Sequence, residues 1–323
     1  MDRDKIREFG GYIELEAFTG EEYHQGLHRL NLARTSLVWL LGNMEPGRVF
    51  LPEFLCDTVR ESAENAGYRI ARYRLNEDLE PVWGPDGKPS GSDIFYLVNY
   101  YGQRSEEEIK RYRDEYDTVV VDNCHAFYSR PVEGVHTIYS LRKFFGVPDG
   151  AYVASDINAM TEDLPLDSSR ERANAIIGRL EECAGAYYAE AKAAEEGFSA
   201  ETPKRMSLFT QNMVKGIDYE AVRQKRVSNY LALHEMLGSE NPFTRSVPEC
   251  PYAYPYHHRD GMALRKHLVE HKIYVPVLWA ELLDEEHRGS LEYEWSANYV
   301  VLPVDQRYDE EDMRYIADVI KRF

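Results

Sequence analysis

The sequence has few cysteines, and their positions form no motif. Cys56, Cys124, Cys183 and Cys250 are scattered, and no two of them make a Cys-x-x-Cys pair. This pattern gives no support for a cysteine-based zinc site or a disulfide framework. Reduced thiols are typical of the cytoplasm, and we expect the protein to be cytoplasmic.

Basic residues and long apolar runs are also scarce. The chain has 38 lysines and arginines against 56 aspartates and glutamates, for a net charge of −18. A surface this acidic repels phosphate backbones and anionic lipids, so we expect neither a nucleic-acid nor a membrane partner. Apolar stretches such as 36–41 are far too short to span a bilayer, and the charged N-terminus lacks the apolar region of a signal peptide.

The chain does contain enough apolar material for a large core. Its 323 residues are 43% hydrophobic and 29% charged, which is ordinary for a globular protein. This length favours a large and a small domain over a single unit. We expect an N-terminal segment over 1–30, a large domain over 31–215, and an interdomain helix with a small domain over 216–323.

Short β-rich runs alternate with helical stretches in the first half. Several runs are apolar on both faces, which is typical of strands in a parallel sheet covered by helices on both sides. Ser105 and Glu108 can form a capping box that starts a helix reaching about Tyr116. The fold class is therefore predicted to be α/β. Strands are predicted over 49–51, 68–73, 94–98, 118–121, 137–140 and 151–154, and a further helix over 56–65.

The second half is richer in helices. We predict one long alanine-rich helix from Ser169 to about Glu196, and an amphipathic helix over 219–237. From about Tyr252 the pattern predicts a strand, a helix opened by Asp260, and two more strands, the last over 298–302. Asp309 is expected to cap a final helix. Together these elements predict a smaller α+β unit.

Asp122 and Lys143 stand where α/β sheets bind their ligands, beyond the carboxyl ends of strands. Chemistry with pyridoxal 5'-phosphate (PLP) needs a lysine that forms a Schiff base and an anion that keeps the pyridine nitrogen protonated. These two residues could supply both groups. Spacing alone favours a simpler interpretation, in which Asp122 caps a turn and Lys143 is a solvated surface lysine.

The stretch from Val119 to Ser155 resembles the PLP-binding core of the fold-type I aminotransferases, specifically the DegT/StrS group of sugar aminotransferases. The blocks NLARTSL, VFLPEFLC and YYGQ, at 31–37, 49–56 and 100–103, are similar to other blocks of that group and occur in the same order. The resemblance implies a mostly parallel seven-stranded-type sheet with a smaller C-terminal α+β domain. The most specific residues are Asp122 with His125, Tyr139-Ser140, Lys143, and Asp149-Gly150.

The resemblance also implies roles for individual residues. Lys143 would carry the Schiff base and move protons, Asp122 would pair with the ring nitrogen, and His125 would contact the ring hydroxyl. Phosphate would be bound by Thr35 and Ser36 at a helix start, and by Ser140. Cys56 stands where many members place an aromatic that stacks on the ring, so Phe54 is the alternative for that role. Ser207 or Thr210 of the partner subunit is a further phosphate contact to consider.

The activity implied is amino transfer from glutamate to a keto sugar, expected to be nucleotide-linked. Members of the fold usually share active sites between two subunits, so a homodimer is expected. Two alternatives stay open. One is a PLP enzyme of other chemistry, such as a lyase or dehydratase, and the other is a non-catalytic binding or regulatory descendant.

Three weaker signals lie in the C-terminal third. His267, Glu270 and His271 match the H-x-x-E-H pattern of a class of zinc peptidases. A five-residue pattern arises easily by chance in a chain with ten histidines, so no metal is expected. The aromatic segment from Tyr252 to His258 is expected to form a strand packed in the small domain. Trp279 is consistent either with the core or with a pocket wall.

Overall fold

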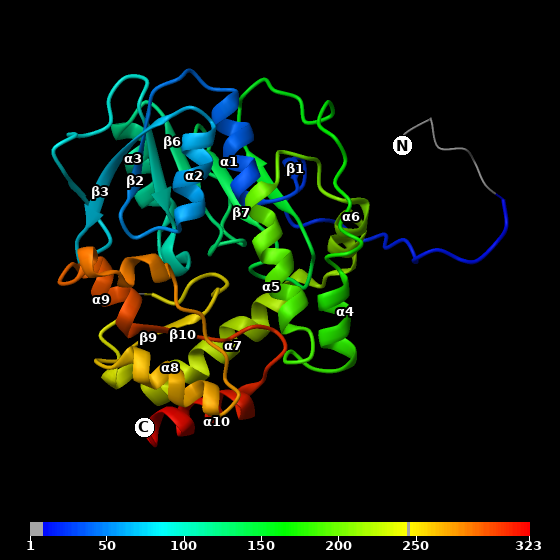
Figure 1. Cartoon of the computed structure of the whole chain (residues 1–323), viewed down its shortest axis with the longest axis vertical. Helices are drawn as coiled ribbons and strands as arrows, with labels where there is room; N and C mark the ends of the chain where they lie inside the picture. The colour runs from blue at the N-terminus through cyan, green and yellow to red at the C-terminus, as the bar shows by residue number, and fades with distance from the viewer. Residues whose placement is uncertain (1–8, 244–245) are drawn as a thin grey trace.

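Eight strands form one mixed sheet in the computed structural model, which describes residues 9–243 and 246–323. The order across the sheet is β1-β8-β7-β6-β5-β2-β3-β4 (Figure 1). Neighbours from β3 to β7 pair in parallel, whereas β8 and β4 run against their neighbours. The strands are β1 (His28–Leu30), β2 (Arg48–Pro52), β3 (Arg69–Leu75), β4 (Pro81–Trp83), β5 (Ile94–Val98), β6 (Val119–Asp122), β7 (His136–Ser140) and β8 (Ala151–Ala154).

The six strands predicted in the first half are all present, and the predicted α/β class with a mostly parallel sheet is confirmed. The short edge strands β1 and β4 bring the number of strands to eight. Helices α1 (Ala33–Gly42), α2 (Asp57–Asn65) and α3 (Glu106–Glu115) connect the strands. The predicted capping box is formed, because the Ser105 side chain accepts from the Glu108 amide and the Glu108 carboxylate accepts from the Ser105 amide.

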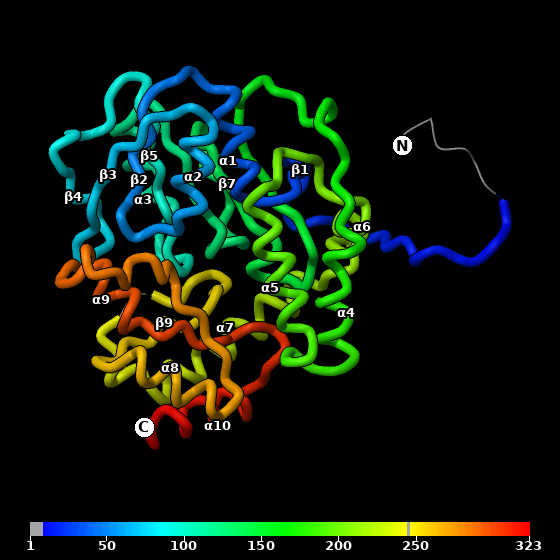
Figure 2. The backbone as a smooth tube through the Cα atoms, in the orientation of Figure 1, coloured from blue at the N-terminus to red at the C-terminus, as the bar shows by residue number. Residues whose placement is uncertain are grey.

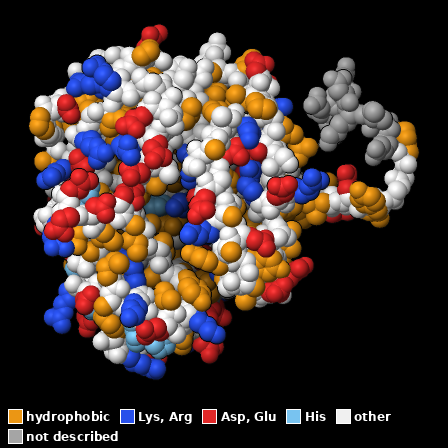
Figure 3. All heavy atoms as spheres, viewed as in Figure 1, with side chains coloured by type: hydrophobic (Ala, Val, Ile, Leu, Met, Phe, Trp, Pro, Cys, Tyr) orange, Lys and Arg blue, Asp and Glu red, His pale blue; other side chains and the backbone are white. Residues whose placement is uncertain are grey.

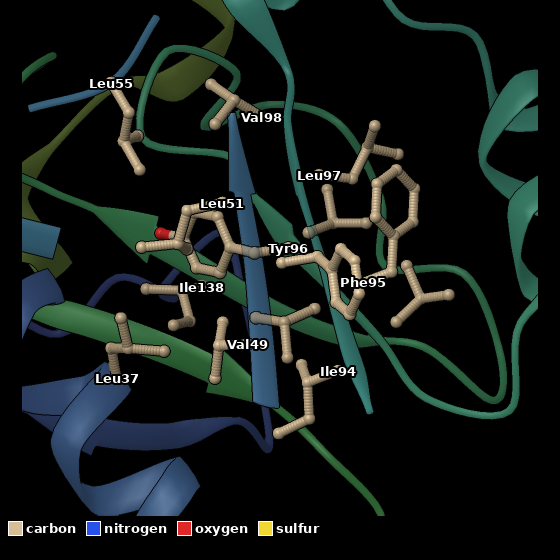
Figure 4. Close-up of a cluster of buried hydrophobic side chains, with 14 of the residues drawn as sticks. Leu37, Val49, Leu51, Leu55, Ile94, Phe95, Tyr96, Leu97, Val98 and Ile138 are labelled. Carbon is tan, nitrogen blue, oxygen red and sulfur yellow. The ribbon is translucent and has the colours of Figure 1, made fainter. Parts of the chain in front are cut away.

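Apolar side chains on both faces of the central strands explain their burial. Every residue of β5 and β6 is buried. Figure 4 shows Val49 and Leu51 of β2 among side chains of β5 and Ile138 of β7, with Leu37 of α1 close by. This packing fixes the carboxyl ends of β5, β6 and β7 at one edge of the sheet.

The single long helix predicted over 169–196 is wrong. The chain forms α4 (Asn174–Glu181) and α5 (Tyr188–Gly197) instead, which lie side by side (Figure 2). A side chain at Gly178 would lie only 2.3 Å from the ring of Tyr187, so the ring packs on the bare backbone of α4. Helix propensity along this alanine-rich stretch is overridden by that contact, and α5 is turned back toward the sheet.

The C-terminal elements lie below the large sheet in Figure 1. They pack around a second apolar cluster that includes Leu233, Leu264 and Met313. The helix predictions here are confirmed, including the caps by Asp260 and Asp309. These elements are α7 (Tyr219–Leu237), β9 (Tyr254–His257), α8 (Gly261–Glu270), α9 (Leu291–Asn298), β10 (Tyr299–Leu302) and α10 (Glu310–Lys321).

A third strand predicted in this part, between α8 and β10, is wrong. Only β9 and β10 pair there in the described chain. Lys272 adopts a positive φ of 60°, and Pro276 has no amide to donate to a strand ladder. The chain therefore leaves α8 as an irregular segment that leads to Trp279.

His24 gives the fold a pH dependence. Its ring is buried, its Nε2 lies 2.6 Å from the carbonyl oxygen of Phe127, and burial lowers its pKa to about 4 from 6.5. Below pH 6.5 the unfolded chain binds a proton that the folded chain does not bind until about pH 4. The contribution of His24 to the free energy of unfolding should therefore fall by about 3 kcal/mol across that interval and level off below it.

Urea titrations between pH 7 and pH 4 measure this effect. The matched variant is His24→Gln, whose amide can still donate to Phe127 but does not titrate. A pH slope in this variant as steep as in the unmodified chain would rule out His24 as the source.

Candidate active site

Asp122 is the last residue of β6, and its carboxylate is held at a fixed position. Oδ2 accepts a hydrogen bond from the Tyr96 hydroxyl at 2.8 Å, and Oδ1 accepts from the Cys124 amide at 2.8 Å. Burial and the neighbouring Asp122 raise the pKa of Tyr96 well above its ordinary value, so its hydroxyl remains a donor. The side chain of Asp122 is buried, yet it forms part of a cavity wall.

Lys143 lies in the connection between β7 and β8, at the same edge of the sheet. Its side chain is accessible within the cavity, and its Nζ is 5.6 Å from the ring centre of Tyr252. Gly150 closes the connection with a φ of 118°, and a Cβ there would lie 2.4 Å from a Leu141 methyl group. Only glycine fits this turn, which also lines the cavity.

One cavity of about 200 Å³ brings most of the predicted site residues together. Figure 3 shows a hollow between the sheet and the C-terminal elements, with basic and histidine side chains visible in its depth. Asp122 and Lys143 thus line one cavity. The predicted residues in the cavity wall are Cys56, Asp122, His125, Ser140 and Lys143.

His125 is fixed by stacking. Its ring is parallel to that of Tyr252, with centres 4.2 Å apart and planes 7° apart, and Trp279 lies farther off at 6.2 Å. Tyr252 precedes β9, so the expectation that it forms a strand packed in the small domain is wrong for this residue. Burial first, and then Lys143, lower the pKa of His125 well below its ordinary value, so its ring is neutral at pH 7.

The Nδ1 atom of His125 is buried and has no hydrogen-bond partner among the described residues. A buried polar atom without a partner is costly, so this atom marks a position for a ligand group. The electrostatic effect of Tyr252 raises the pKa of Lys143 above its ordinary value. It outweighs burial, which alone would lower that pKa. Lys143 is therefore an ammonium group at neutral pH before any ligand binds.

The structure does not place Thr35 and Ser36 in the cavity wall. Both are fully buried in the first turns of α1, and both hydroxyls donate to the carbonyl oxygen of Leu32, at 3.0 and 2.7 Å. Neither hydroxyl is therefore free in this structure to make the expected contact to a phosphate. Ala33 and Arg34, at the very start of the helix, line the cavity instead.

Phe54 is likewise outside the cavity wall. Its ring is buried and packs edge-on against Trp279, with ring centres 4.2 Å apart. The wall position belongs to Trp279 and Cys56. Trp279 has a left-handed backbone with a φ of 56°, a strained conformation for a bulky residue and one typical of functional sites.

Ser207 and Thr210 are enclosed within their own chain. Asp149 accepts hydrogen bonds from the amide and hydroxyl of Ser207, at 2.8 and 2.7 Å, and from the hydroxyl of Thr210. Both residues are fully buried, so neither is free to reach a second subunit's phosphate. Their physical role is to hold Asp149 beside Gly150.

The H-x-x-E-H pattern has ordinary contacts. His267 Nε2 lies 3.3 Å from the Val319 carbonyl oxygen, and His271 Nδ1 lies 2.9 Å from the carbonyl oxygen of His267. Within residues 9–243 and 246–323, no group of three or more His, Cys, Asp or Glu side chains is arranged to hold a metal ion. No helix in the same ranges is both long enough and apolar enough to cross a membrane.

A second, larger cavity of about 500 Å³ adjoins the first. Leu55 and Cys56 belong to both walls. The larger cavity is lined mainly by charged side chains. On one side they come from β3, α2 and the residue after β2, and on the other from the segment before α9 and from α9 itself. The charged residues are Glu53, Asp57, Arg60, Arg72, Arg74, Glu281, Asp284, Glu286 and Glu292.

Comparisons with known proteins identify the fold. No family model and no curated protein matches the chain. Among solved structures, S. venezuelae DesV is 14% identical with a TM-score of 0.63, over 91% of this chain and 84% of that one. The PLP form of Spr1654 from Streptococcus pneumoniae is 12% identical with a TM-score of 0.63, over 95% and 92%. Sugar aminotransferase CalS13 from Micromonospora echinospora is 17% identical with a TM-score of 0.60, over 92% and 87%. This chain has the sugar-aminotransferase fold.

Arg226 ties the C-terminal elements of the sugar-aminotransferase fold to the cavity. It is fully buried in α7 and donates to the carbonyl oxygens of Phe144, Pro251 and Tyr252 at 3.0–3.1 Å. Phe144 follows Lys143 directly, and Tyr252 stacks on His125. One guanidinium group thus fixes the backbone behind both site residues.

Replacing Arg226 with leucine should lower the free energy of unfolding by about 3–5 kcal/mol, because buried carbonyl oxygens lose their donors. The control is Arg223→Leu, one turn earlier, where only an exposed ion pair with Glu220 is lost. That change should cost less than about 1 kcal/mol in urea unfolding. Equal losses in the two variants would contradict the bracing role of Arg226.

Proposed function

We propose that the chain is a PLP-dependent aminotransferase that moves an amino group from glutamate to a keto sugar carried by a nucleotide. The observation that carries the proposal is the shared cavity of Lys143 and Asp122. An amine and a buried carboxylate at the strand ends of this fold are the two groups that PLP requires.

The residues of the cavity fit this cofactor. The buried Nδ1 of His125 lacks a partner among the described residues and suits the ring hydroxyl. Asp122 would hold the ring nitrogen, Ser140 is a candidate contact to the phosphate, and Cys56 lies against the same space. Bound PLP supplies an electron sink for the carbon from which a proton is removed.

The chain's own residues then control the protons. Lys143 must lose a proton before its amine can bond to the cofactor, so loading should become faster as the pH rises from 7 to 9. When it is not bonded to the cofactor, the same amine would be able to take up and return a proton as a general base and acid. Hydrogen bonds from Tyr96 and from the Cys124 amide fix the position of the Asp122 side chain.

The adjoining cavity supports the substrate assignment. Its charged side chains can hydrogen-bond many hydroxyl groups, and Arg72 and Arg74 of β3 offer positive charge for phosphate or carboxylate groups. The junction at Leu55 and Cys56 would bring a carbonyl group held there close to the cofactor cavity.

The proposed enzyme is a cytoplasmic homodimer. Its cysteines are free thiols, consistent with a reducing compartment. The N-terminal arm stands away from the body in Figure 1 and exposes Tyr12, Ile13 and Leu15, which suits burial against a second subunit. We keep the proposed division into 1–30, 31–215 and 216–323, of which residues 1–8 lie outside the described residues. Light scattering on the purified chain tests the dimer.

The decisive experiment adds PLP to the purified chain, reduces with borohydride and maps the modified lysine by mass spectrometry. Modification of Lys143 and a visible absorption band are expected. Loss of that band on adding glutamate, with formation of 2-oxoglutarate, separates amino transfer from lyase or dehydratase chemistry. A chain that never acquires the band would be the non-catalytic descendant.

A further inference from the structure

An anion of the protein itself lies in the cofactor cavity. Glu195 of α5 accepts from Arg34 at 3.0 Å through one carboxylate oxygen and from Arg142 at 2.6 Å through the other. Arg34 belongs to the first turn of α1, and Arg142 immediately precedes Lys143. All four residues, Lys143 included, line the same cavity.

The two arginines also contact a buried aromatic ring, that of Phe198, which directly follows α5. The guanidinium groups of Arg34 and Arg142 lie 5.9 and 4.2 Å from the ring centre of Phe198, which is buried. Arg172 approaches the same ring at 5.4 Å. This stacking keeps two positive charges beside the cavity even if Glu195 moves away.

Glu195 is much less firmly held. Its side chain is 52% exposed, and α5 buries none of its ten residues. The helix is directed to this position by the turn between α4 and α5 described above. Partial desolvation raises the pKa of Glu195, but Arg142, Arg34 and Lys143 together outweigh it and lower the pKa, so the side chain is a carboxylate at neutral pH.

A phosphate monoester fits this arrangement better than a carboxylate does. It carries up to two negative charges and three acceptor oxygens, which can bind two guanidinium groups and still accept from backbone amides. The first amides of α1 have no acceptors within the helix, and Leu32, Ala33 and Arg34 line the cavity there.

We propose that Arg34 and Arg142 form the phosphate site of this cavity, and that Glu195 occupies it until a phosphate monoester displaces it. The inference rests on the proposed function, since PLP is the phosphate monoester concerned. Binding of the cofactor would then free α5 from the cavity mouth. Thr35 and Ser36, whose hydroxyls are already bonded, are not required for this contact.

The test compares PLP with pyridoxal, which lacks the phosphate, in absorbance titrations. Glu195→Gln removes the competing charge, so the Kd for PLP should fall by about fivefold to thirtyfold while that for pyridoxal changes less than about twofold. Arg34→Gln with Arg142→Gln should raise the Kd for PLP by about tenfold or more and again leave pyridoxal nearly unchanged. Glu196→Gln is the matched control, because Glu196 is exposed and pairs with Lys192 of its own helix at 3.7 Å, away from the two arginines.

Hydrogen exchange of residues 188–197 gives a readout that is independent of PLP chemistry. Inorganic phosphate at millimolar concentration should speed exchange in the unmodified chain and in the Glu196→Gln control. It should have little effect in Glu195→Gln, where exchange is already fast. No response to phosphate, or equal PLP affinity in the Glu195→Gln and Glu196→Gln variants, would overturn the inference.

Failure of the proposed function gives a different pattern. In that case neither PLP nor pyridoxal modifies Lys143 in any variant. The exchange experiment with inorganic phosphate still reports whether Glu195 competes for Arg34 and Arg142.

Discussion

Replacing Lys143 with alanine should abolish the visible absorption band that PLP gives with the chain and lower the rate of amino transfer by about a thousandfold or more. One amine has two roles here, bonding to the cofactor and moving the proton. Loss of a positioned general base alone lowers a reaction rate by about a hundredfold to ten-thousandfold. Absorbance titration and single-turnover kinetics with glutamate measure the two effects.

The control for this variant is Lys110→Ala. Lys110 is an exposed residue of α3 that pairs with Glu106, one turn earlier. Its removal should leave the band and the rate unchanged. Since the Lys143 side chain is accessible and donates no hydrogen bond to any other described residue, the Lys143→Ala variant should also unfold at the same urea concentration as the unmodified chain. A persistent, borohydride-reducible band in the Lys143→Ala variant would assign the chemistry to another lysine.

The features that could be predicted best from the sequence are those formed by short stretches of chain, such as strands and tight turns. Asp122 ends one short buried strand and Lys143 follows another, and burial on both faces is typical of neighbouring strands in a parallel sheet. The carboxyl ends of β6 and β7 therefore had to meet at one edge. Gly150 could also be anticipated, because an Asp-Gly pair between two strands predicts a tight turn.

Contacts between segments far apart in the chain could not be predicted from local sequence patterns. Tyr252 stacks on His125 across more than a hundred residues of chain, and Glu195 meets Arg34 only because Tyr187 packs on Gly178 and breaks the predicted helix. Propensity alone gives a continuous helix there.

The proposed phosphate contacts show how accurately a motif match can place a residue on a helix. On a helix, a change of one residue rotates a side chain by about 100°. A motif match that is uncertain by one position therefore cannot decide between Arg34 and Thr35. In the structure the Thr35 hydroxyl donates to Leu32 and Asn31 whereas Arg34 lines the cavity, which supports the proposal of Arg34 over Thr35. Arg142, the other proposed phosphate contact, lies in the irregular connection between β7 and β8. The sequence pattern there does not predict which way a side chain points.

Replacing Asp122 with asparagine should leave cofactor binding at Lys143 intact but slow the half-reaction with glutamate by about a hundredfold to a thousandfold. An amide has nearly the same shape as the carboxylate and can still accept from the Cys124 amide. It carries no negative charge, so it cannot keep a pyridine nitrogen protonated. The electron sink is then weaker, and the proton that Lys143 must remove is less acidic.

Tyr96→Phe separates charge from position in this prediction. That variant keeps the charge of Asp122 but removes the hydroxyl that donates to Oδ2 at 2.8 Å. We expect a stability loss of about 1–3 kcal/mol and a rate loss well below that of Asp122→Asn. If the carboxylate served only to cap the turn at Cys124, Asp122→Asn would transaminate at the unmodified rate while Tyr96→Phe lost stability alone. A slow half-reaction in Asp122→Asn with an unchanged band at Lys143 instead requires that the negative charge itself act on the cofactor ring.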